Sequence, residues 1–174
     1  YIEKDKLLTL NSKENISILK GLYKDSVTLK DLDINVKVGN VVWNECKDIL
    51  TDDNSNTLLV YSSDIKENKL CIQNYKNESK KNYINKKGMK GPILVVNRGY
   101  GNAGYKLNYG LIKYDKEYLI ENHLICLHYT KKIDNQILIK FYEKIIESFK
   151  NKKTKQFIDL YFGNNAISTT ELNN

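Results

Sequence analysis

Several features that mark membrane-spanning, secreted or metal-binding proteins are absent from the sequence. No run approaches the roughly 20 apolar residues of a membrane-spanning helix. The first residues, YIEKDKLLTLNSKEN, lack the apolar centre of a signal peptide. The cysteines Cys46, Cys71 and Cys126 are odd in number and unpatterned, which favours free thiols in a reducing compartment over disulfides or a zinc site. We therefore expect a soluble, cytoplasmic protein without a bound metal.

Acidic residues are too few to balance the basic ones, and arginine is nearly absent. The formal net charge of +7 favours a polyanionic partner over an acidic protein or an uncharged metabolite, with nucleic acid first and a membrane surface second. Of the 28 lysine and arginine residues, only Arg98 is an arginine. An A/T-rich coding sequence would account for so many lysines, but it does not account for this single exception.

At 174 residues the chain is long enough for one hydrophobic core, and its apolar pattern mixes both kinds of secondary structure. The expected strands are short segments within 27–42, bent at Gly39, and segments at 58–65, 68–76, 92–97, 105–112 and 119–129. The expected helices are a lead-in around 16–24, an amphipathic helix over 138–149 capped by Asp134 or Asn135, and a short helix at 154–162. We expect the α+β class, with a curved, mostly antiparallel sheet and helices packed at its ends.

Glycines cluster directly after one apolar run. Residues 93–98, ILVVNR, lead into Gly-Tyr-Gly-Asn-Ala-Gly at 99–104, which fits the G-x-G-x-x-G pattern of a dinucleotide turn. That turn requires a helix after its third glycine, because the helix N-terminus holds the pyrophosphate. Residues 105–112 instead alternate as a strand does. We therefore reject a cofactor loop and expect the tip of a hairpin, whose glycines allow close approach to another backbone or to a duplex.

The only arginine opens this loop. A guanidinium group is a planar fork of donors that suits a phosphate or the O6/N7 edge of guanine, which an ammonium does not match. Asn97 beside it would read adenine in the same bidentate way if it points outward. The alternative is structural: a buried Arg98 that pairs with Asp64 or Glu121 and braces the loop.

Positive charge and polar side chains accompany the loop, as a DNA-binding surface requires. Residues 76–90 are rich in lysine, hold a single glutamate, and are expected to form an exposed basic loop that neutralises phosphates. The residues predicted to reach base edges are Asn44, Ser62, Ser63, Asp64, Asn97, Arg98 and Asn102. The residues predicted to contact phosphates are Lys47, Lys80, Lys81, Lys86, Lys87, Tyr100, Tyr105 and Lys106. A solvated face without a ligand is the alternative for many of these lysines.

Trp43, His123 and His128 each have a plainer interpretation. Trp43 is expected in the core rather than as a stacking platform for a base. The two histidines are expected in one apolar strand, where their spacing points them to opposite faces and does not make a metal pair. We expect them in the core or at a sheet edge.

Six segments follow one another in a characteristic order. They are VKVGNVVWNECKDIL (36–50), LLVYSSDI (58–65), GPILVVNRGYGNAGY (91–105), YLIENHLICLHY (118–129), FYEKIIESF (141–149) and FGNNAISTTELNN (162–174). This order resembles the target recognition domain of bacterial adenine-N6 DNA methyltransferases and of the specificity subunits of type I restriction systems. The similarity covers 26–174, nearly the whole chain.

The resemblance implies a domain at 26–174 that recognises a specific site in double-stranded DNA. Residues 1–25 would be the lead-in helix and linker to a catalytic methyltransferase domain or subunit. The chain itself lacks the (Asp/Asn/Ser)-Pro-Pro-aromatic tetrapeptide that holds a flipped adenine in this family, because Pro92 is its only proline. The resemblance therefore implies no catalytic residue and no cofactor in this chain, with S-adenosylmethionine bound by the catalytic part. It implies duplex DNA, and no membrane, as the partner.

Two other classes stay open. Asp52, Asp53, Asp64 and Glu67 are close in sequence, and Glu67-Asn68-Lys69 is loosely similar to the Glu-x-Lys of metal-dependent nucleases, although it falls at a turn. The other class is an RNA-binding or protein-interaction module. Metal-dependent cleavage of plasmid DNA would identify a nuclease, and a preference for RNA over duplex DNA of the same sequence would identify an RNA-binding module.

Overall fold

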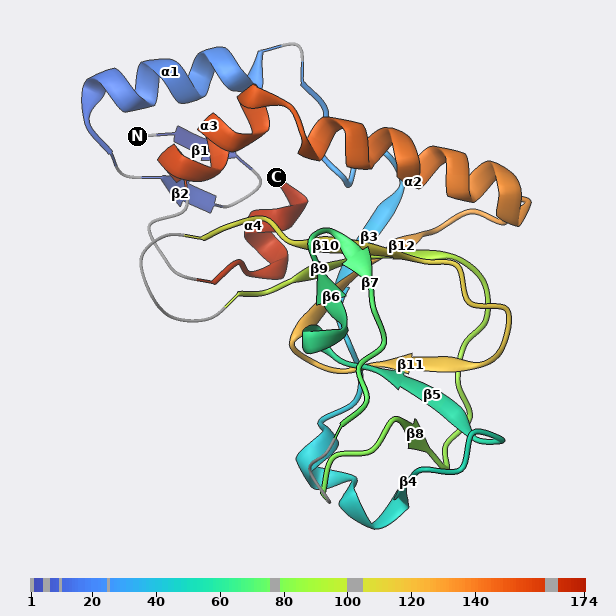
Figure 1. The fold of residues 1–174 in the computed structure, drawn as a ribbon. Coiled ribbons are helices and arrows are strands. Elements are labelled where there is room, and N and C mark those ends of the chain that lie inside the picture. Colours follow the sequence, from blue (N-terminus) through green and yellow to red (C-terminus); the bar gives the residue numbers. More distant parts are fainter. Residues whose placement is uncertain are drawn as a thin grey trace.

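The chain folds into an α+β arrangement of helices and mostly antiparallel sheets (Figure 1). The structure is a computed structural model that describes residues 2–4, 7–9, 11–24, 26–75, 79–99, 105–161 and 166–174. Within these ranges the strands are divided between two four-stranded sheets and two two-stranded hairpins. The expected α+β class and the mostly antiparallel pairing are confirmed.

The first sheet is antiparallel throughout and has the strand order β10–β9–β12–β3. Its strands are β3 (Ile34–Val38), β9 (Ile93–Asn97), β10 (Tyr109–Ile112) and β12 (Leu124–Tyr129). The central strand β9 carries Leu94, Val95 and Val96, none of which has exposed surface. A continuous apolar run of this kind is typical of a strand that is covered on both faces. The expected hairpin from β9 to β10 is confirmed.

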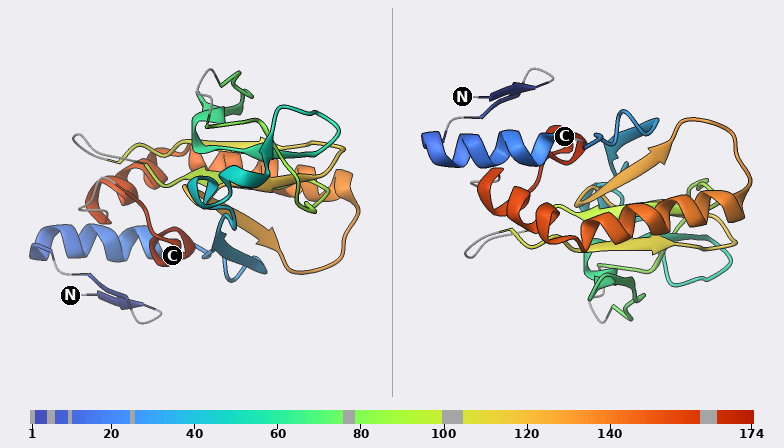
Figure 2. Two further views of the ribbon diagram at one scale, coloured as in Figure 1. Left: turned by 90° about the horizontal axis from the view of Figure 1, so that it is seen from below. Right: turned by 90° about the horizontal axis from the view of Figure 1, so that it is seen from above.

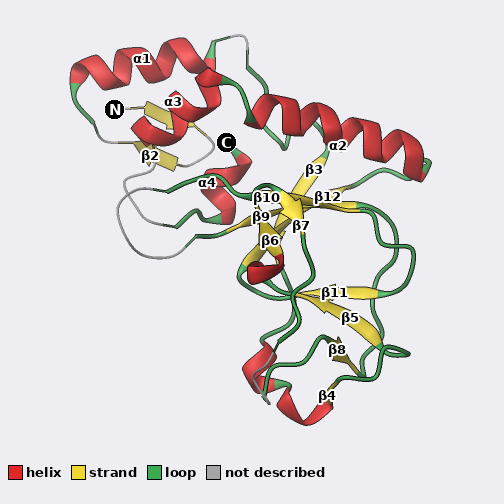
Figure 3. Ribbon diagram, in the orientation of Figure 1, coloured by secondary structure: helices red, strands yellow, loops and turns green. Residues whose placement is uncertain are grey.

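The second sheet has the order β11–β5–β8–β4 and lies on the side of the first sheet away from the helices (Figures 1 and 3). Its strands are β4 (Leu50–Thr51), β5 (Thr57–Val60), β8 (Tyr83–Ile84) and β11 (Tyr118–Ile120). β5 and β11 are parallel, whereas β8 is antiparallel to both of its neighbours. The 3-10 turns η1 (Trp43–Glu45) and η2 (Lys47–Ile49) precede this sheet in the chain, and η3 (Ser62–Asp64) follows β5.

Two short hairpins complete the described strands: β1 (Ile2–Lys4) with β2 (Leu7–Thr9), and β6 (Ile65–Lys66) with β7 (Lys69–Leu70). Glu67 and Asn68 at the second turn have φ of 49° and 59°, as a two-residue hairpin turn of the I′ type requires. The Asn68 N–H donates to Asn108 Oδ1 (3.3 Å), and the Tyr109 N–H donates to Asn68 Oδ1 (3.2 Å). These hydrogen bonds attach the hairpin to the start of β10.

The α-helices in the described ranges are α1 (Lys13–Tyr23), α2 (Asn135–Phe149), α3 (Lys152–Tyr161) and α4 (Thr169–Asn173). They gather on one side of the first sheet (Figures 1 and 2). α2 begins at the expected cap, because the Asp134 side chain accepts from the N–H groups of Gln136 (2.8 Å) and Ile137 (3.4 Å). The buried Tyr142 of α2 donates its hydroxyl to the carbonyl of Leu127 in β12 (2.6 Å). None of these helices has the length and apolar character needed to cross a bilayer.

Several predicted segments differ from the structure. Of the strand expected at 68–76, only Lys69–Leu70 is a strand among the described residues. The expected strand at 119–129 is two strands, β11 and β12, separated by a turn at 121–123, because the chain passes there from one sheet to the other. The strand expected at 105–112 begins only at Tyr109. The lysine-rich segment 76–90 is not simply an exposed loop, since it contributes β8, whose Ile84 has no exposed surface.

Candidate nucleic-acid interface

Three segments that are far apart in sequence meet where β5, β9 and β11 end. The Asn97 side-chain N–H donates to the carbonyl of Ser62 (3.2 Å), and the Ser62 N–H donates to Glu121 Oε2 (3.2 Å). The Arg98 N–H donates to the carbonyl of His123 (3.1 Å). These hydrogen bonds join the segments into one group of residues. We call residues 61–64, 97–98 and 121–123 the convergent site.

A glycine determines how closely one backbone segment approaches Glu121. A Cβ at Gly39 would lie 2.2 Å from the carbonyl oxygen of Glu121, nearer than real Cβ atoms come. Hydrogen bonds from the Gly39 N–H to the Leu124 carbonyl (2.8 Å) and from the Val41 N–H to the Ile120 carbonyl (3.2 Å) hold the two segments together. Only glycine allows this approach, so the bend expected at Gly39 positions part of the convergent site.

Arg98 is half-buried, and its backbone is held on both sides. Its N–H donates to the carbonyl of His123, and its own carbonyl accepts from the Ile167 N–H (2.8 Å). The ion pairs found among the described residues do not include Arg98, so the bracing pair with a carboxylate, considered as an alternative, is not formed there. The charge of Arg98 acts on His123, because burial first, then Arg98 and Lys80, lower the pKa of that imidazole.

Asp64, which the sequence assigns to a base edge, has no exposed surface, and this assignment is corrected. Its carboxylate accepts from the N–H groups of Tyr61 (2.8 Å) and Gln73 (2.8 Å) and from the Tyr75 hydroxyl (2.6 Å). Burial raises the pKa of Asp64, although these hydrogen bonds and the charge of Lys80 oppose the rise. The carboxylate therefore shapes the turn η3 and does not reach the surface.

Glu121 is a second buried carboxylate, with 2% of its surface exposed. Its Oε2 accepts from the Ser62 N–H, and its Oε1 contacts Nδ1 of His123. Burial is the main cause of the raised pKa of Glu121, and the hydrogen bond from Ser62 and the charge of Lys80 oppose it. His123 lies in the turn between β11 and β12, with 37% of its side chain exposed, rather than within a strand as expected. The site thus places an imidazole at the surface above a buried acid.

Asn97 and Tyr105 direct their polar groups into the protein. Asn97 Oδ1 accepts from the Gly99 N–H (3.0 Å), while its amide N–H donates to Ser62. Tyr105 is 8% exposed, and its hydroxyl donates to the carbonyl of Asn97 (2.8 Å). Because Tyr105 is buried, its predicted phosphate contact is wrong. The oxygen and the nitrogen of the Asn97 side-chain amide both form hydrogen bonds within the protein, so this amide is not turned outward.

Two of the lysines assigned to phosphates contact other side chains of the protein. Lys80 is half-buried, and its Nζ lies 4.1 Å from the ring centroid of Tyr61 and 4.2 Å from that of Tyr75, so two aromatic rings of the protein already accompany the ammonium. Burial lowers the pKa of Lys80. Lys81 forms an ion pair with the exposed Asp52. Surface pairs of this kind contribute only about 0–1 kcal/mol, so a phosphate can replace Asp52 as the partner of Lys81.

The other predicted contact residues differ in their exposure. Those that the structure places on the exposed surface are Asn44, Lys47, Ser63, Lys86, Lys87 and Lys106, while Ser62 is half-buried. Tyr100 and Asn102 lie outside the described residues. Trp43 is half-buried against the core cluster that contains Tyr61, and Lys47 Nζ is 5.7 Å from the centroid of its ring. The expected core position of Trp43 is therefore only partly realised.

The acidic residues considered for a nuclease do not gather around a metal position. Asp52 pairs with Lys81, Asp53 accepts from the Ser55 N–H of its own turn (2.9 Å), and Glu67 lies in the β6–β7 hairpin turn. Across the described ranges, no group of three or more His, Cys, Asp or Glu side chains could hold a metal ion. The nuclease alternative receives no support from these positions.

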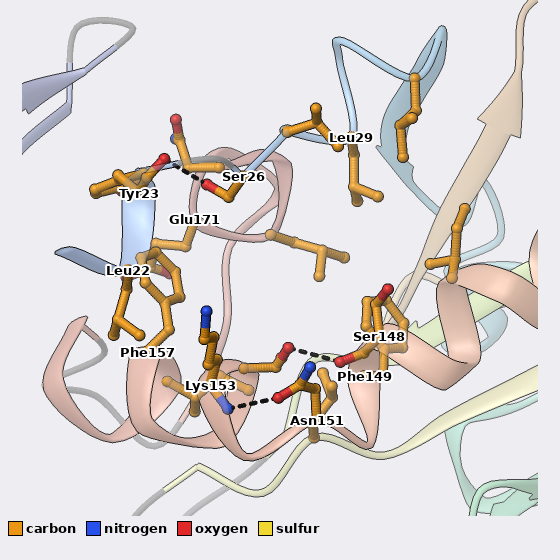
Figure 4. A pocket seen from close by; sticks show the side chains of 18 of the residues that line it. Leu22, Tyr23, Ser26, Leu29, Ser148, Phe149, Asn151, Lys153, Phe157 and Glu171 are labelled. Carbon is orange, nitrogen blue, oxygen red and sulfur yellow. Dashed lines mark hydrogen bonds between the residues drawn. The ribbon is translucent and has the colours of Figure 1, made fainter. Parts of the chain in front are cut away.

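A cavity of about 470 Å³ lies apart from the convergent site (Figure 4). Helices α1, α3 and α4 and the end of α2 surround it, with apolar side chains such as Leu22, Leu29, Phe149 and Phe157 in its lining. No residue of the convergent site lines it. None of the described residues predicted to contact DNA lines it either.

Comparison with known proteins assigns no family: no protein-family model matches the sequence, and no curated protein shows significant similarity to it. The functional conclusion therefore rests on the residues and their geometry. From the sequence alone, Tyr75 has no predicted role, Glu121 is considered only as a bracing partner of Arg98, and His123 is expected in the core or at a sheet edge. One signal was available, because Glu121 is the only acid in the apolar segment 118–129, and a carboxylate in such a run needs a buried partner.

Proposed function

We propose that the chain is a recognition domain for a specific sequence in double-stranded DNA and serves an adenine-N6 DNA methyltransferase system. Three features support the proposal: the net charge of +7, a single arginine beside a glycine-rich loop, and a segment order that resembles target recognition domains. In this proposal a methyltransferase domain or subunit outside the chain is the catalytic partner. S-adenosylmethionine is the cofactor of that partner alone.

The position of Arg98 is the observation that carries the proposal. Strand β9 delivers this residue to the place where three segments meet, and hydrogen bonds through its N–H and its carbonyl hold its backbone. A side chain presented from a fixed backbone loses less conformational entropy on binding than one on a free loop. The exposed Ser63 on η3 adjoins the same site. The only arginine of the chain thus extends from a backbone that is fixed on both sides.

Sequence choice and affinity would come from different side chains. The guanidinium of Arg98 can donate to O6 and N7 of one guanine, and a good bidentate pair gives roughly 1–3 kcal/mol of discrimination between bases. The exposed lysines Lys86, Lys87 and Lys106 would neutralise phosphates, and each neutralised phosphate adds about 0.9 to the slope of log affinity against log salt. Phosphate contacts fix the register of the protein, while base contacts read the sequence.

Selection from a pool of duplexes with a randomised central segment tests the proposal. The chain is mixed with the pool at low salt, and the bound duplexes are recovered and sequenced over several rounds. We expect one short motif to be enriched, and we expect that duplex DNA carrying the motif binds more tightly than RNA of the same sequence. A pool without an enriched motif, or tighter binding of the RNA, would refute the proposal.

A second assay addresses the nuclease alternative with the same protein. Plasmid DNA is incubated with the chain in the presence of Mg²⁺ or Mn²⁺, and the products are separated on an agarose gel. The plasmid is expected to remain intact. Cleavage that depends on the metal ion would assign the chain to the nucleases instead.

A further inference from the structure

Lys80 occupies an aromatic cage, which we define as the rings of Trp43, Tyr61 and Tyr75. Its Nζ lies 4.1 Å from the ring centroid of Tyr61, 4.2 Å from that of Tyr75 and 5.9 Å from that of Trp43. All three distances fall within the roughly 6 Å over which a cation is attracted to an aromatic ring. Nζ also donates to Ser63 Oγ (3.3 Å). The neighbours of this half-buried lysine's ammonium are therefore aromatic rings and a hydroxyl group.

Hydrogen bonds fix two of the three rings. Tyr61 has no exposed surface, and its hydroxyl donates to the carbonyl of Lys81 (2.6 Å). The Tyr75 hydroxyl donates to Asp64 Oδ1 (2.6 Å), and the two tyrosine rings meet edge to face with centroids 4.9 Å apart. Because both tyrosine rings have their own hydrogen-bond partners, the fold fixes most of the position that the ammonium occupies.

Two buried carboxylates lie beside the cage. The side chain of Asp64 accepts from the N–H of Tyr61, and that of Glu121 accepts from the next N–H along the chain, which belongs to Ser62. The two acids thus hold consecutive residues at the start of η3. The charge of Lys80 acts on both acids and opposes the rise in pKa that burial causes in each. Without that cation, two buried carboxylates would lie near each other uncompensated.

We propose that Lys80 is a positioning residue of the recognition site: its ammonium, which lies in the aromatic cage, holds η3 in the arrangement that presents Arg98 to DNA. Lys80 contacts η3 directly, because its Nζ donates to Ser63 Oγ (3.3 Å), and its charge also acts on Glu121, whose carboxylate accepts from the N–H of Ser62. The carbonyl of Ser62 in turn accepts from the side chain of Asn97, the neighbour of Arg98. The effect on DNA rests on the proposed function, whereas the position of the ammonium is a property of the protein alone.

NMR spectroscopy of the wild-type chain tests the position of the ammonium without DNA. The ring currents of Tyr61 and Tyr75 are expected to shift the Cε protons of Lys80 upfield relative to those of the exposed Lys86. If the Cε protons of the two lysines resonate at the same position, Lys80 does not lie in the cage and the proposal is overturned.

A matched pair of variants separates the charge of Lys80 from its bulk. Lys80→Met keeps an apolar stem without the charge, while Lys80→Arg keeps the charge, which the rings also accept. Because Lys80 contributes to the lowered pKa of His123, Lys80→Met is expected to raise that pKa and Lys80→Arg to leave it lowered. His128 is the internal control, since burial and Lys37 lower its pKa. An unchanged pKa of His123 in Lys80→Met, or equal shifts at both histidines, would overturn the proposal.

Duplex selection then tests the role of Lys80 in recognition. Lys80→Met is expected to bind DNA at low salt but to lose its preference for the enriched motif by about tenfold, while Lys80→Arg keeps most of it. Full preference in Lys80→Met, or loss of preference in a folded Lys80→Arg, would exclude the positioning role. If Lys80→Met does not fold, the wild-type spectrum and Lys80→Arg still decide. If the wild-type chain enriches no motif, the proposed function is wrong. The NMR measurements then still show whether the Lys80 ammonium lies in the aromatic cage.

Discussion

Gly39 and Glu121 are in direct backbone contact: a Cβ at Gly39 would fall 2.2 Å from the carbonyl oxygen of Glu121. The contact continues in an isolated parallel bridge between Val41 and Glu121. In this position the Glu121 carboxylate accepts from the N–H of Ser62. Two residues further along the chain, the carbonyl of His123 accepts from the N–H of Arg98. The position of the only arginine therefore depends on a glycine far away in the sequence.

Gly39→Ala is expected to destabilise the fold, because the added methyl group meets backbone atoms that cannot rotate aside. Overpacking of this kind costs about 1–3 kcal/mol in the free energy of unfolding, which urea denaturation followed by circular dichroism measures. Gly21→Ala is the matched control, since a Cβ there meets nothing within 4 Å. Gly21 lies within α1, so its replacement is expected to stabilise by roughly 0.5–1 kcal/mol. Equal effects at the two glycines would refute the close approach.

Asp64→Asn is expected to destabilise the protein even though it removes a charge from the interior. Asp64 accepts from three donors through both of its oxygens. An asparagine has one oxygen, so its NH₂ group faces at least one N–H or O–H donor without an acceptor. The expected loss is about 1–3 kcal/mol in urea denaturation at pH 7. Asp48→Asn, at an exposed position, serves as the control, and a similar loss in both variants would argue against the buried site.

The same substitution tests the direction of the pKa shift of Asp64. Burial raises the pKa of Asp64 in the folded protein above the unfolded value of about 3.9. The contribution of this carboxyl to stability is therefore complete below the unfolded value and is lost as the pH rises through the folded value. The difference in unfolding free energy between wild type and Asp64→Asn is expected to shrink as the pH rises from about 4 toward neutrality. A difference that grows with pH would mean that the hydrogen bonds outweigh burial.

The parts of the fold that the sequence predicts well are set by local patterns. The apolar repeat over 138–149 predicts α2, and Asp134 predicts its cap, because the period of a helix and its capping involve neighbouring residues only. The apolar run before Arg98 predicts β9 in the same way. The turn at 121–123 escapes prediction, because the chain changes sheets there and the flanking residues are apolar on both sides.

The candidate site is less predictable than the fold. Asp64 is of a residue type that can contact a base edge, but its carboxylate is buried. The hydrogen-bond donors that it meets there come from its own turn and from the separate segment around Tyr75. Lys80 belongs to a lysine-rich stretch, and only the folded chain brings the rings of Trp43 and Tyr61 around it. Whether a polar side chain points outward or inward is decided by such long-range contacts, which residue type and spacing do not encode.

Lys86→Met is expected to weaken DNA binding equally for all sequences, because an exposed ammonium meets phosphate and not a base edge. The slope of log affinity against log salt should fall by about 1, with the enriched motif unchanged. Fluorescence anisotropy over a series of salt concentrations measures this slope. Lys144→Met on α2, which lies on the helical side of the first sheet, is expected to leave the slope unaltered (Figure 1). Equal changes in both variants would point to diffuse binding without a defined surface.

In the proposed function, the guanidinium group of Arg98 reads the DNA sequence. Arg98→Lys keeps the positive charge and removes the planar fork, and Lys144→Arg controls for a conservative exchange at an exposed position. The decisive measurement is duplex selection with both variants beside the wild-type chain. We expect that Arg98→Lys still binds DNA but loses roughly 1–3 kcal/mol of preference for the motif, while Lys144→Arg keeps that preference. If Arg98→Lys enriches the same motif as strongly as the wild-type chain does, the guanidinium group does not read the sequence.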